Sequence, residues 1–275
     1  MSGAVESVHE VVAGNPYPGR GVVWARTLDG ALCGGYFLTG RSPASRTRTV
    51  RRGDGELIVA PTAAPAAPAG PGGPGAPGAP GVPGVPGAPA HDPLRHYVAA
   101  RERDGWLVFG NGEQVATVSD RLRRGHAPAE ALSGLEYEPD PPIFTPRITV
   151  VADVRDDAGD DARDDTRPGR EAWFGAARRG RGGRTAADVL TLAVRDLEPG
   201  DAVLMTTYRS DGRTVATGEP YHEVRTEAAG RDGLLEELWS ALDPRLRVAA
   251  AVFEPHRTAE AAVRHEIVPG PGSGP

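Results

Sequence analysis

Apolar residues along the chain fall into short runs that end at glycine, proline or charged residues, a pattern that predicts β-strands. Residues 21–27 and 31–39 form two such runs. The Asp29-Gly30 pair between them predicts a hairpin, because glycine accepts the positive φ that such turns require. Further strands are predicted at residues 56–60, 106–109, 114–118, 148–154, 173–177, 189–194, 202–208, 214–217 (after an Asp211-Gly212 turn) and 247–253.

Helices are expected between some of these strands. Asp92 as N-cap and Pro93 at the first position predict a helix that ends at Arg103, on which Tyr97 and Arg101 would share a face. Three more helices are predicted at residues 119–124, 127–132 and 234–242. Strands in two sets with helices outside them predict an α+β fold of two packed sheets covered by helices.

Two segments have compositions that cannot form a core. Residues 61–90 are almost wholly proline, glycine and alanine, and residues 153–170 are mostly aspartate, arginine and glycine. The Gly-X-Pro period of the first is too short for a collagen helix, and arginines within the second oppose a calcium site. We predict that both are surface loops, the first of them disordered, within a single domain spanning residues 1–275. The rest, about 225 residues, suffices for one well-buried domain.

Composition excludes several classes of protein. The formal charge is -6, the positive charge comes from arginine alone, and no basic stripe indicates nucleic-acid binding. Cys33 is the only cysteine, which rules out a disulfide or thiolate metal site within one chain, and the seven histidines show no zinc spacing. No apolar run reaches the length of a membrane span, and the N-terminus lacks a signal-peptide pattern. We expect a cytoplasmic protein without a membrane or nucleic-acid partner.

Three polar cassettes stand at the ends of apolar runs, where rigid elements present side chains to ligands. The first is N-P-Y-P-G-R-G at residues 15–21, continuing in G-R-S-P-A-S-R at residues 40–46. The second is G-N-G-E-Q at residues 110–114, and the third is Y-E-P-D at residues 137–140, reaching T-P-R-I at residues 145–148. Arginines combined with a few carboxylates suit an anionic small molecule whose reacting part needs proton transfer.

In order and spacing these cassettes resemble the archaeal-type IMP cyclohydrolase family, most closely its bacterial members. The likeness covers residues 14–60 and 91–150, and more weakly 171–255. It implies interconversion of inosine monophosphate (IMP) and water with 5-formamido-1-(5-phosphoribosyl)imidazole-4-carboxamide, in purine biosynthesis. It also implies an αββα four-layer sandwich resembling N-terminal-nucleophile hydrolases and a purine nucleotide as ligand. No cofactor or metal is expected. Neither Cys33 nor Ser2 stands at the N-terminus, so autoproteolytic chemistry is not expected.

The resemblance also implies site residues. Glu138 would be the general base, Tyr97 the proton donor and Arg46 the group that stabilises a developing oxyanion. The next candidate for the base is Asp140. The predicted substrate-binding residues are Arg41, Ser42, Arg101, Asn111, Gly112, Asp140, Arg147 and Tyr208.

One departure from the family pattern leaves a second hypothesis open. Val115-Ala116 replaces a polar Thr-Asp pair that bacterial relatives usually carry after the second cassette. The alternative is a purine-nucleotide-binding protein that has lost catalysis and acts in regulation or partner interaction. The sequence leaves open whether the protein is a homo-oligomer and whether it serves housekeeping or specialised metabolism.

Overall fold

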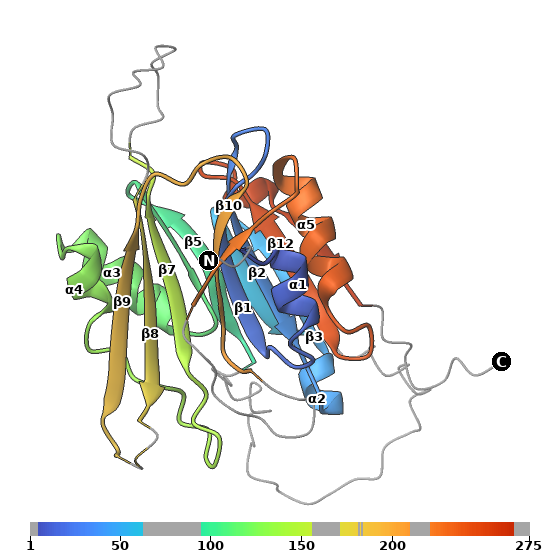
Figure 1. The fold of residues 1–275 in the computed structure, drawn as a ribbon. Helices are drawn as coiled ribbons and strands as arrows, with labels where there is room; N and C mark the ends of the chain where they lie inside the picture. The colour runs from blue at the N-terminus through green and yellow to red at the C-terminus, as the bar shows by residue number, and fades with distance from the viewer. Residues whose placement is uncertain are drawn as a thin grey trace, which may run out of the picture.

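The computed structural model describes residues 5–62, 95–155, 171–180, 182, 184–209 and 221–266. Two antiparallel sheets pack against each other, and helices cover their outer faces (Figure 1). The fold is therefore α+β, as predicted. The single-domain organisation of residues 1–275 stays a prediction, because most of the two low-complexity segments lies outside the described residues.

Within the described residues the first sheet has six strands in the order β11-β10-β1-β2-β12-β13. Its middle is a hairpin in which Trp24 pairs with Gly34. Gly30 in the connecting turn has φ +86°, which an L side chain rarely adopts. The strands are β1 (Arg20–Arg26), β2 (Leu32–Thr39), β10 (Asp201–Thr206), β11 (His222–Arg225), β12 (Arg247–Phe253) and β13 (Ala262–His265).

The second sheet, over the same described residues, has seven strands in sequential order from β3 to β9. Each strand pairs with the next along the chain, so the sheet is a meander. Its strands are β3 (Arg48–Gly53), β4 (Glu56–Pro61), β5 (Tyr97–Arg103), β6 (Trp106–Gly110), β7 (Arg147–Asp153), β8 (Ala172–Arg179) and β9 (Ala187–Val194).

Helices bury the outer faces of both sheets. Val12 of α1 and Leu238 of α5 pack with Phe37 of the first sheet. On the second sheet, Val118 of α3 and Leu132 of α4 join one apolar cluster. The helices are α1 (Val8–Ala13), α2 (Pro43–Arg46), α3 (Gln114–Arg123), α4 (Pro128–Leu132) and α5 (Gly230–Ala241), with a short 3-10 helix η1 (Thr258–Glu260).

The main core lies between the sheets. Trp24 of the first sheet lies 6.3 Å from Phe109 of the second, measured between ring centroids. Phe109 also meets Phe253 edge to face at 5.2 Å. Burial of such rings is the dominant favourable contribution to folding, at roughly 25 cal/mol per Å² of apolar surface.

Most of the predicted strands are confirmed, with ends that differ by one or two residues. The helices predicted at residues 127–132 and 234–242 are confirmed as α4 and α5. The turn at 211–212 and the strand at 214–217 lie outside the described residues, as do residues 63–90 and 156–170 of the predicted loops. The described edges of those loops include strand ends, at Pro61 in β4 and Asp153 in β7. Val154 is buried in the core between the sheets, so the prediction that the second segment contributes nothing to the core is wrong at this residue.

The helix predicted to end at Arg103 is wrong. Residues 97–103 form β5, which pairs with β4 and β6, and Asp92-Pro93 lies outside the described residues. The register against β4 shifts so that Ala99 is an extra residue, a β-bulge. Because the bulge reverses the alternation, Tyr97 faces the core between the sheets whereas Arg101 lies on the other face.

The strand predicted at residues 114–118 is also wrong. These residues begin helix α3, and Ser119 lies inside that helix instead of capping one. Val115, Val118 and Leu122 are buried in one stripe against the second sheet, at the three- and four-residue spacing of a helix. Packing of this stripe outweighs the strand preference of the valines.

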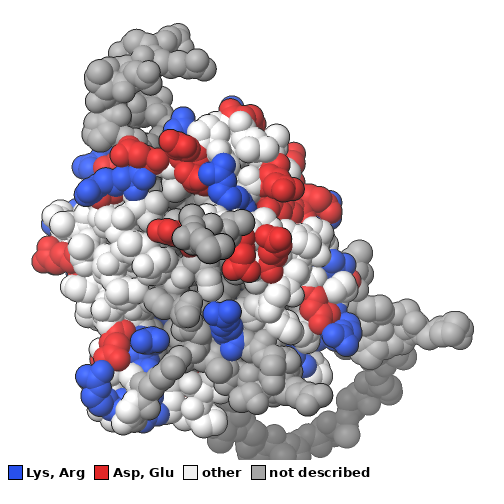
Figure 2. Space-filling view, viewed as in Figure 1, with Lys and Arg blue, Asp and Glu red and all other residues white. Residues whose placement is uncertain are grey.

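The visible face of the molecule carries mixed charge. Arginines and acidic side chains lie next to one another in Figure 2, in keeping with ion pairs such as Arg225 with Asp201 at 2.5 Å. Among the described helices, none combines the length and apolar character needed to cross a membrane.

Candidate active site

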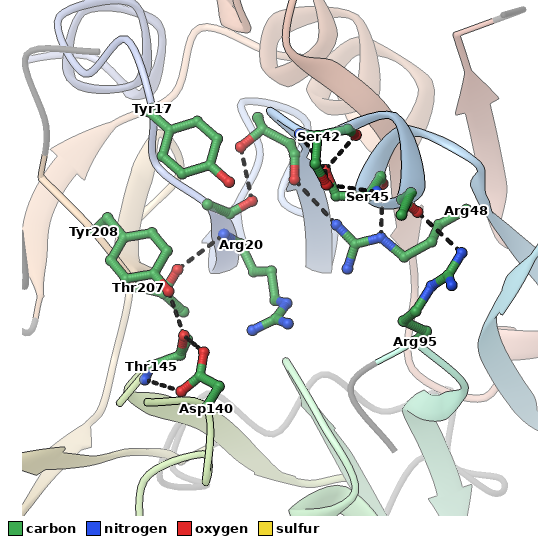
Figure 3. Close-up of a pocket in the computed structure, with 13 residues that line it drawn as sticks. Tyr17, Arg20, Ser42, Ser45, Arg48, Arg95, Asp140, Thr145, Thr207 and Tyr208 are labelled. Carbon is green, nitrogen blue, oxygen red and sulfur yellow. Dashed lines mark hydrogen bonds between the residues drawn. The ribbon is translucent and has the colours of Figure 1, made fainter. Parts of the chain in front are cut away.

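A cavity of about 340 Å³ opens where the two sheets bring their loops together (Figure 3). Its volume is within the usual range for small-molecule sites, about 300–1,000 Å³. The first cassette, helix α2, the start of β3, the third cassette and the end of β10 contribute to it. The lining residues are Tyr17, Gly19, Arg20, Thr39, Ser42, Ala44, Ser45, Arg48, Arg95, Asp140, Thr145, Thr207 and Tyr208.

Arg20 connects the cavity with a buried carboxylate. Its Nη1 donates to Oε1 of Glu138 at 2.8 Å, and the two side chains are only 12% and 3% exposed. Figure 3 shows the guanidinium of Arg20 in the middle of the view, between Tyr208 and Arg48. Glu138 does not line the cavity but contacts Arg20, which does.

Gly19 sets the position of Arg20. It has φ +73°, and a Cβ at this position would lie 2.4 Å from both Thr207 and Tyr208. Its carbonyl accepts from the Thr39 hydroxyl at 3.0 Å. Glycine is therefore required here for backbone conformation and for close approach, which explains its place in the first cassette.

Burial and mutual charge have opposite effects on the pKa of each residue in the Arg20–Glu138 pair. Burial raises the pKa of Glu138 above its ordinary value, although the charge of Arg20 opposes this shift. For Arg20, burial alone would lower the pKa, but the neighbouring Glu138 carboxylate raises it well above the usual range. A carboxyl with a raised pKa suits proton transfer near neutral pH.

Asn111 of the second cassette contacts the carboxyl of Glu138. Asn111 Nδ2 donates to the Pro146 carbonyl at 2.8 Å and to Glu138 Oε1 at 3.4 Å. The Asn111 Oδ1 accepts from the Ile148 backbone N–H at 2.8 Å. Glu138 Oε2 is buried and has no hydrogen-bond partner among the described residues. A buried polar atom without a protein partner is available to a ligand or water.

A tyrosine pair lies next to Arg20. The hydroxyls of Tyr36 and Tyr97, one from each sheet, are 2.6 Å apart in the core. Burial, and then the neighbouring Tyr97, raise the pKa of Tyr36 well above its usual range, so its hydroxyl stays protonated. The contact therefore links the two sheets by a hydrogen bond beside Arg20.

A cationic wall forms the opposite side of the cavity. Arg48 donates from Nε to the Ser45 carbonyl at 2.8 Å and from Nη2 to the Thr39 carbonyl at 3.2 Å. Arg95 Nη2 donates to the Ala44 carbonyl at 3.1 Å. Burial lowers the pKa of Arg48. Guanidinium groups and serine hydroxyls side by side suit a phosphate group.

Aromatic rings and a hydroxyl chain form the remaining side. Tyr17 and Tyr208 stack with centroids 5.9 Å apart and planes at 11°. The Tyr208 hydroxyl is hydrogen-bonded to the Thr145 hydroxyl, which lies 2.5 Å from Asp140 Oδ2. Burial raises the pKa of Tyr208 to about 12. This side therefore offers neutral oxygens, a carboxylate and a flat apolar surface.

Comparison with protein families supports the resemblance. The sequence profile of the family described as IMP cyclohydrolase-like protein matches residues 83–257. The chain belongs to this family. No curated protein matches the chain. The matched region includes the second and third cassettes and Tyr208, whereas the first cassette precedes it.

Several residues predicted for the site lie at the cavity. Ser42, Asp140 and Tyr208 line it, and Glu138 reaches it through Arg20. Arg41 does not line it, but its guanidinium lies 4.5 Å from the centroid of the Tyr17 ring, which does.

Other predicted residues lie farther from it. Arg46, at the end of α2, does not line the cavity, and its Nε is buried with no hydrogen-bond partner in the described part of the chain. Arg101 pairs with Glu56 at 2.7 Å and is likewise not part of the lining. Arg147 pairs with Glu113 at 2.9 Å.

Residues of the second cassette lie next to Glu138 and not at the cavity. Gly112, like Asn111, is buried behind Glu138 and does not line the cavity. A Cβ on Gly112 would lie 2.7 Å from Gln114 Oε1 and 3.4 Å from Glu138 Oε1, so only glycine fits without displacement.

Several lining residues were not predicted from the sequence. For Arg20 the signal was present, because it lies within the N-P-Y-P-G-R-G segment, and Thr145 stands in T-P-R-I. Arg48 and Arg95 lie outside the cassettes and gave no local signal. Among the described residues no group of three or more histidine, cysteine, aspartate or glutamate side chains is arranged to hold a metal ion.

Proposed function

We propose that the protein is an IMP cyclohydrolase that interconverts IMP and water with 5-formamido-1-(5-phosphoribosyl)imidazole-4-carboxamide in purine biosynthesis. The main support is the buried Glu138 carboxyl beside the cavity, with its raised pKa, one oxygen on Arg20 and the other without a partner in the described chain. Family membership supports the general chemistry.

In the ring-opening direction, water adds to the purine carbon between the two ring nitrogens, and the bond from that carbon to N1 breaks. Glu138 takes one proton from the attacking water as it adds across the C2–N3 double bond, and N3 gains a proton. When the C2–N1 bond breaks, the hydroxyl on C2 gives up its proton as the formyl C=O forms, and N1 gains a proton. In ring closure the carboxamide nitrogen attacks the formyl carbon, and the formyl oxygen departs as water. Charge develops on an oxygen in both directions, and hydrogen-bond donors fixed in advance stabilise it.

Arg20 is better placed than Arg46 to stabilise this oxyanion. Arg20 lines the cavity and contacts Glu138, whereas Arg46 does neither. Tyr97 remains our proposed proton donor. Tyr97 does not line the cavity, but its hydroxyl is hydrogen-bonded to that of Tyr36, and both tyrosines lie close enough to Arg20, which does line it, to influence its pKa.

The cavity has two chemically different sides, which supports one orientation of the nucleotide. The phosphate would bind to Arg48 and Arg95, next to the hydroxyls of Ser42 and Ser45. One guanidinium group can donate two parallel hydrogen bonds to phosphate oxygens. The base would then lie towards Tyr17 and Tyr208, near Arg20.

We also propose that the fold resembles N-terminal-nucleophile hydrolases, since helices cover the outer face of each of two packed sheets. The characteristic nucleophile chemistry is not part of the proposal. Burial raises the pKa of the lone Cys33 to about 12, and this thiol packs between the first sheet and its helices.

A turnover assay tests the proposed activity. The purified protein is mixed with the formamido ribotide, and IMP formation is followed by absorbance. We expect rapid ring closure without added metal or cofactor. A folded protein that gives no IMP above the uncatalysed rate contradicts the proposal.

The alternative, a nucleotide-binding protein without catalysis, was based on Val115-Ala116. Val115 is buried in the cluster between α3 and the second sheet, and neither Val115 nor Ala116 lines the cavity. Calorimetry separates the two hypotheses, because tight IMP binding without turnover favours the alternative.

A further inference from the structure

The hydrogen bonds among Asp140, Thr145 and Tyr208 have a fixed direction. An ionised carboxylate only accepts hydrogen bonds, and a threonine hydroxyl has one proton to donate. Asp140 accepts from the Thr145 backbone N–H at 2.7 Å, and its second oxygen lies 2.5 Å from the Thr145 hydroxyl. The Thr145 proton is therefore committed to Asp140.

The direction of this chain determines what Tyr208 can do. Since the Thr145 oxygen has no second proton, the phenolic proton of Tyr208 must point at Thr145. No other hydrogen bond of the Tyr208 hydroxyl is present among the described residues. Tyr208 thus lines the cavity as a hydrogen-bond acceptor, and Figure 3 shows the three side chains in line along one side.

The neighbourhood of Tyr208 makes this acceptor selective. The carboxylate of Asp140 and the stacked ring of Tyr17 share its side of the cavity, while Arg48 and Arg95 lie across from it. A nucleotide with its phosphate at the arginines has its base towards the acceptors. A ring that presents an N–H there can donate a hydrogen bond to Tyr208, and its binding is favoured. A ring that presents an unprotonated nitrogen places its own acceptor against the Tyr208 acceptor, and its binding is disfavoured.

We propose that Tyr208, held as an acceptor by Thr145 and Asp140, selects 6-oxopurine over 6-aminopurine nucleotides by accepting a hydrogen bond from ring N1–H. This inference rests on the proposed function, since it places a purine nucleotide in the cavity. A 6-oxopurine carries a proton on N1, whereas N1 of a 6-aminopurine is an acceptor. In the ring-opened precursor the same nitrogen is the carboxamide NH₂, which Tyr208 would orient for attack.

Three variants test this specificity role by calorimetry with IMP and AMP, using AMP displacement of IMP where its own signal is weak. The unmodified protein should prefer IMP. Thr145→Val retains the size of the side chain but frees the Tyr208 hydroxyl to donate its proton. The affinity for AMP should therefore rise, and the ratio of IMP affinity to AMP affinity should fall about tenfold. Thr145→Ser keeps the hydroxyl and should keep the preference. Tyr208→Phe should weaken IMP binding about tenfold with no gain for AMP.

A purely structural role predicts a different result, because loss of packing weakens both nucleotides together and leaves their ratio unchanged. An unchanged ratio in both Thr145→Val and Tyr208→Phe, or equal affinity of the unmodified protein for IMP and AMP, overturns the inference. If Thr145→Val does not fold, as judged by thermal unfolding, the Tyr208→Phe ratio decides.

Selectivity without turnover would reject the proposed activity alone, and turnover with an unchanged ratio would reject this inference alone. No nucleotide binding would reject both.

Discussion

Arg20 and Glu138 are 118 positions apart in the sequence, yet Arg20 Nη1 lies 2.8 Å from Glu138 Oε1 in a buried ion pair. Arg20 opens a strand of the first sheet, and Glu138 lies in the third cassette, before β7 of the second sheet. The pair therefore joins the two halves of the site beside the cavity. It also makes the charge of each residue depend on the other.

Disruption of this pair should destabilise the protein. Arg20→Met leaves the Glu138 carboxyl buried without its partner and should lower the free energy of unfolding by about 3–5 kcal/mol. Adding Glu138→Gln removes the charge left behind and should restore a large part of that loss. Urea unfolding of both single variants and the double variant measures the coupling. Simple addition of the two single effects would mean that the residues do not interact.

The raised pKa of Glu138 should appear in the pH dependence of activity. A general base must be deprotonated, so kcat/KM should fall as pH decreases through the pKa of Glu138. Because burial raises that pKa, the midpoint of this acid limb should lie above the ordinary value of 4.5. A pH–rate profile measures it, and a midpoint at or below 4.5 would contradict the assignment.

The raised pKa of Glu138 also determines how its contribution to stability changes with pH. Since the pKa of Glu138 is higher in the folded protein than in the unfolded chain, the folded state binds more protons above about pH 4.5. The stabilisation from this group is complete below that pH and is lost as pH rises through the folded pKa. Relative to Glu138→Gln, the unmodified protein should therefore lose stability between the two pKa values. If the unmodified protein instead gained stability relative to Glu138→Gln as pH rises, folding would lower the pKa of Glu138, which contradicts the prediction.

The two buried tyrosines should differ in function. If Tyr97 donates the proton, Tyr97→Phe should lower kcat by about 10²-fold or more, with KM little changed. Tyr36→Phe is the matched control, because it removes the other hydroxyl of the same 2.6 Å contact. It should reduce stability by about 1 kcal/mol and lower kcat less. Equal losses of kcat would assign the two hydroxyls a shared structural role.

Glu113 should restrain Arg147. The side chains are 2.9 Å apart, with Glu113 52% and Arg147 15% exposed, so their ion pair is a weak one at the surface. If Arg147 binds the anionic substrate, Glu113→Gln should lower KM up to about fivefold, equivalent to about 1 kcal/mol. Arg147→Gln should raise KM. Steady-state kinetics at low salt gives both values, and no change in either variant would remove Arg147 from the site.

Local signals in the sequence predicted the elements that depend on local chemistry. The hairpin around Gly30 follows from an Asp-Gly turn between two apolar runs. The errors occur where distant packing decides. Residues 97–103 form a strand because β4 and β6 pair with them, and Val115 and Val118 are helical because both pack against the second sheet.

The same distinction applies to the site. The family resemblance indicated Glu138, but its partner Arg20 is only known from the fold, because 118 positions separate them. Arg48 and Arg95 carry no motif, so no spacing could have placed them at the cavity. Arg101 matched the pattern, but the bulge at Ala99 places it on the other face of the sheet.

The most direct test of the account is the initial rate of IMP formation from the formamido ribotide by three proteins. Glu138→Gln should lower kcat by about 10²–10⁴-fold while IMP binding is largely retained. Glu56→Gln removes a carboxylate from another ion pair of the second sheet, with Arg101, and should leave kcat close to that of the unmodified protein. Unchanged turnover in a folded Glu138→Gln variant would contradict the account, because the buried carboxyl would then be structural.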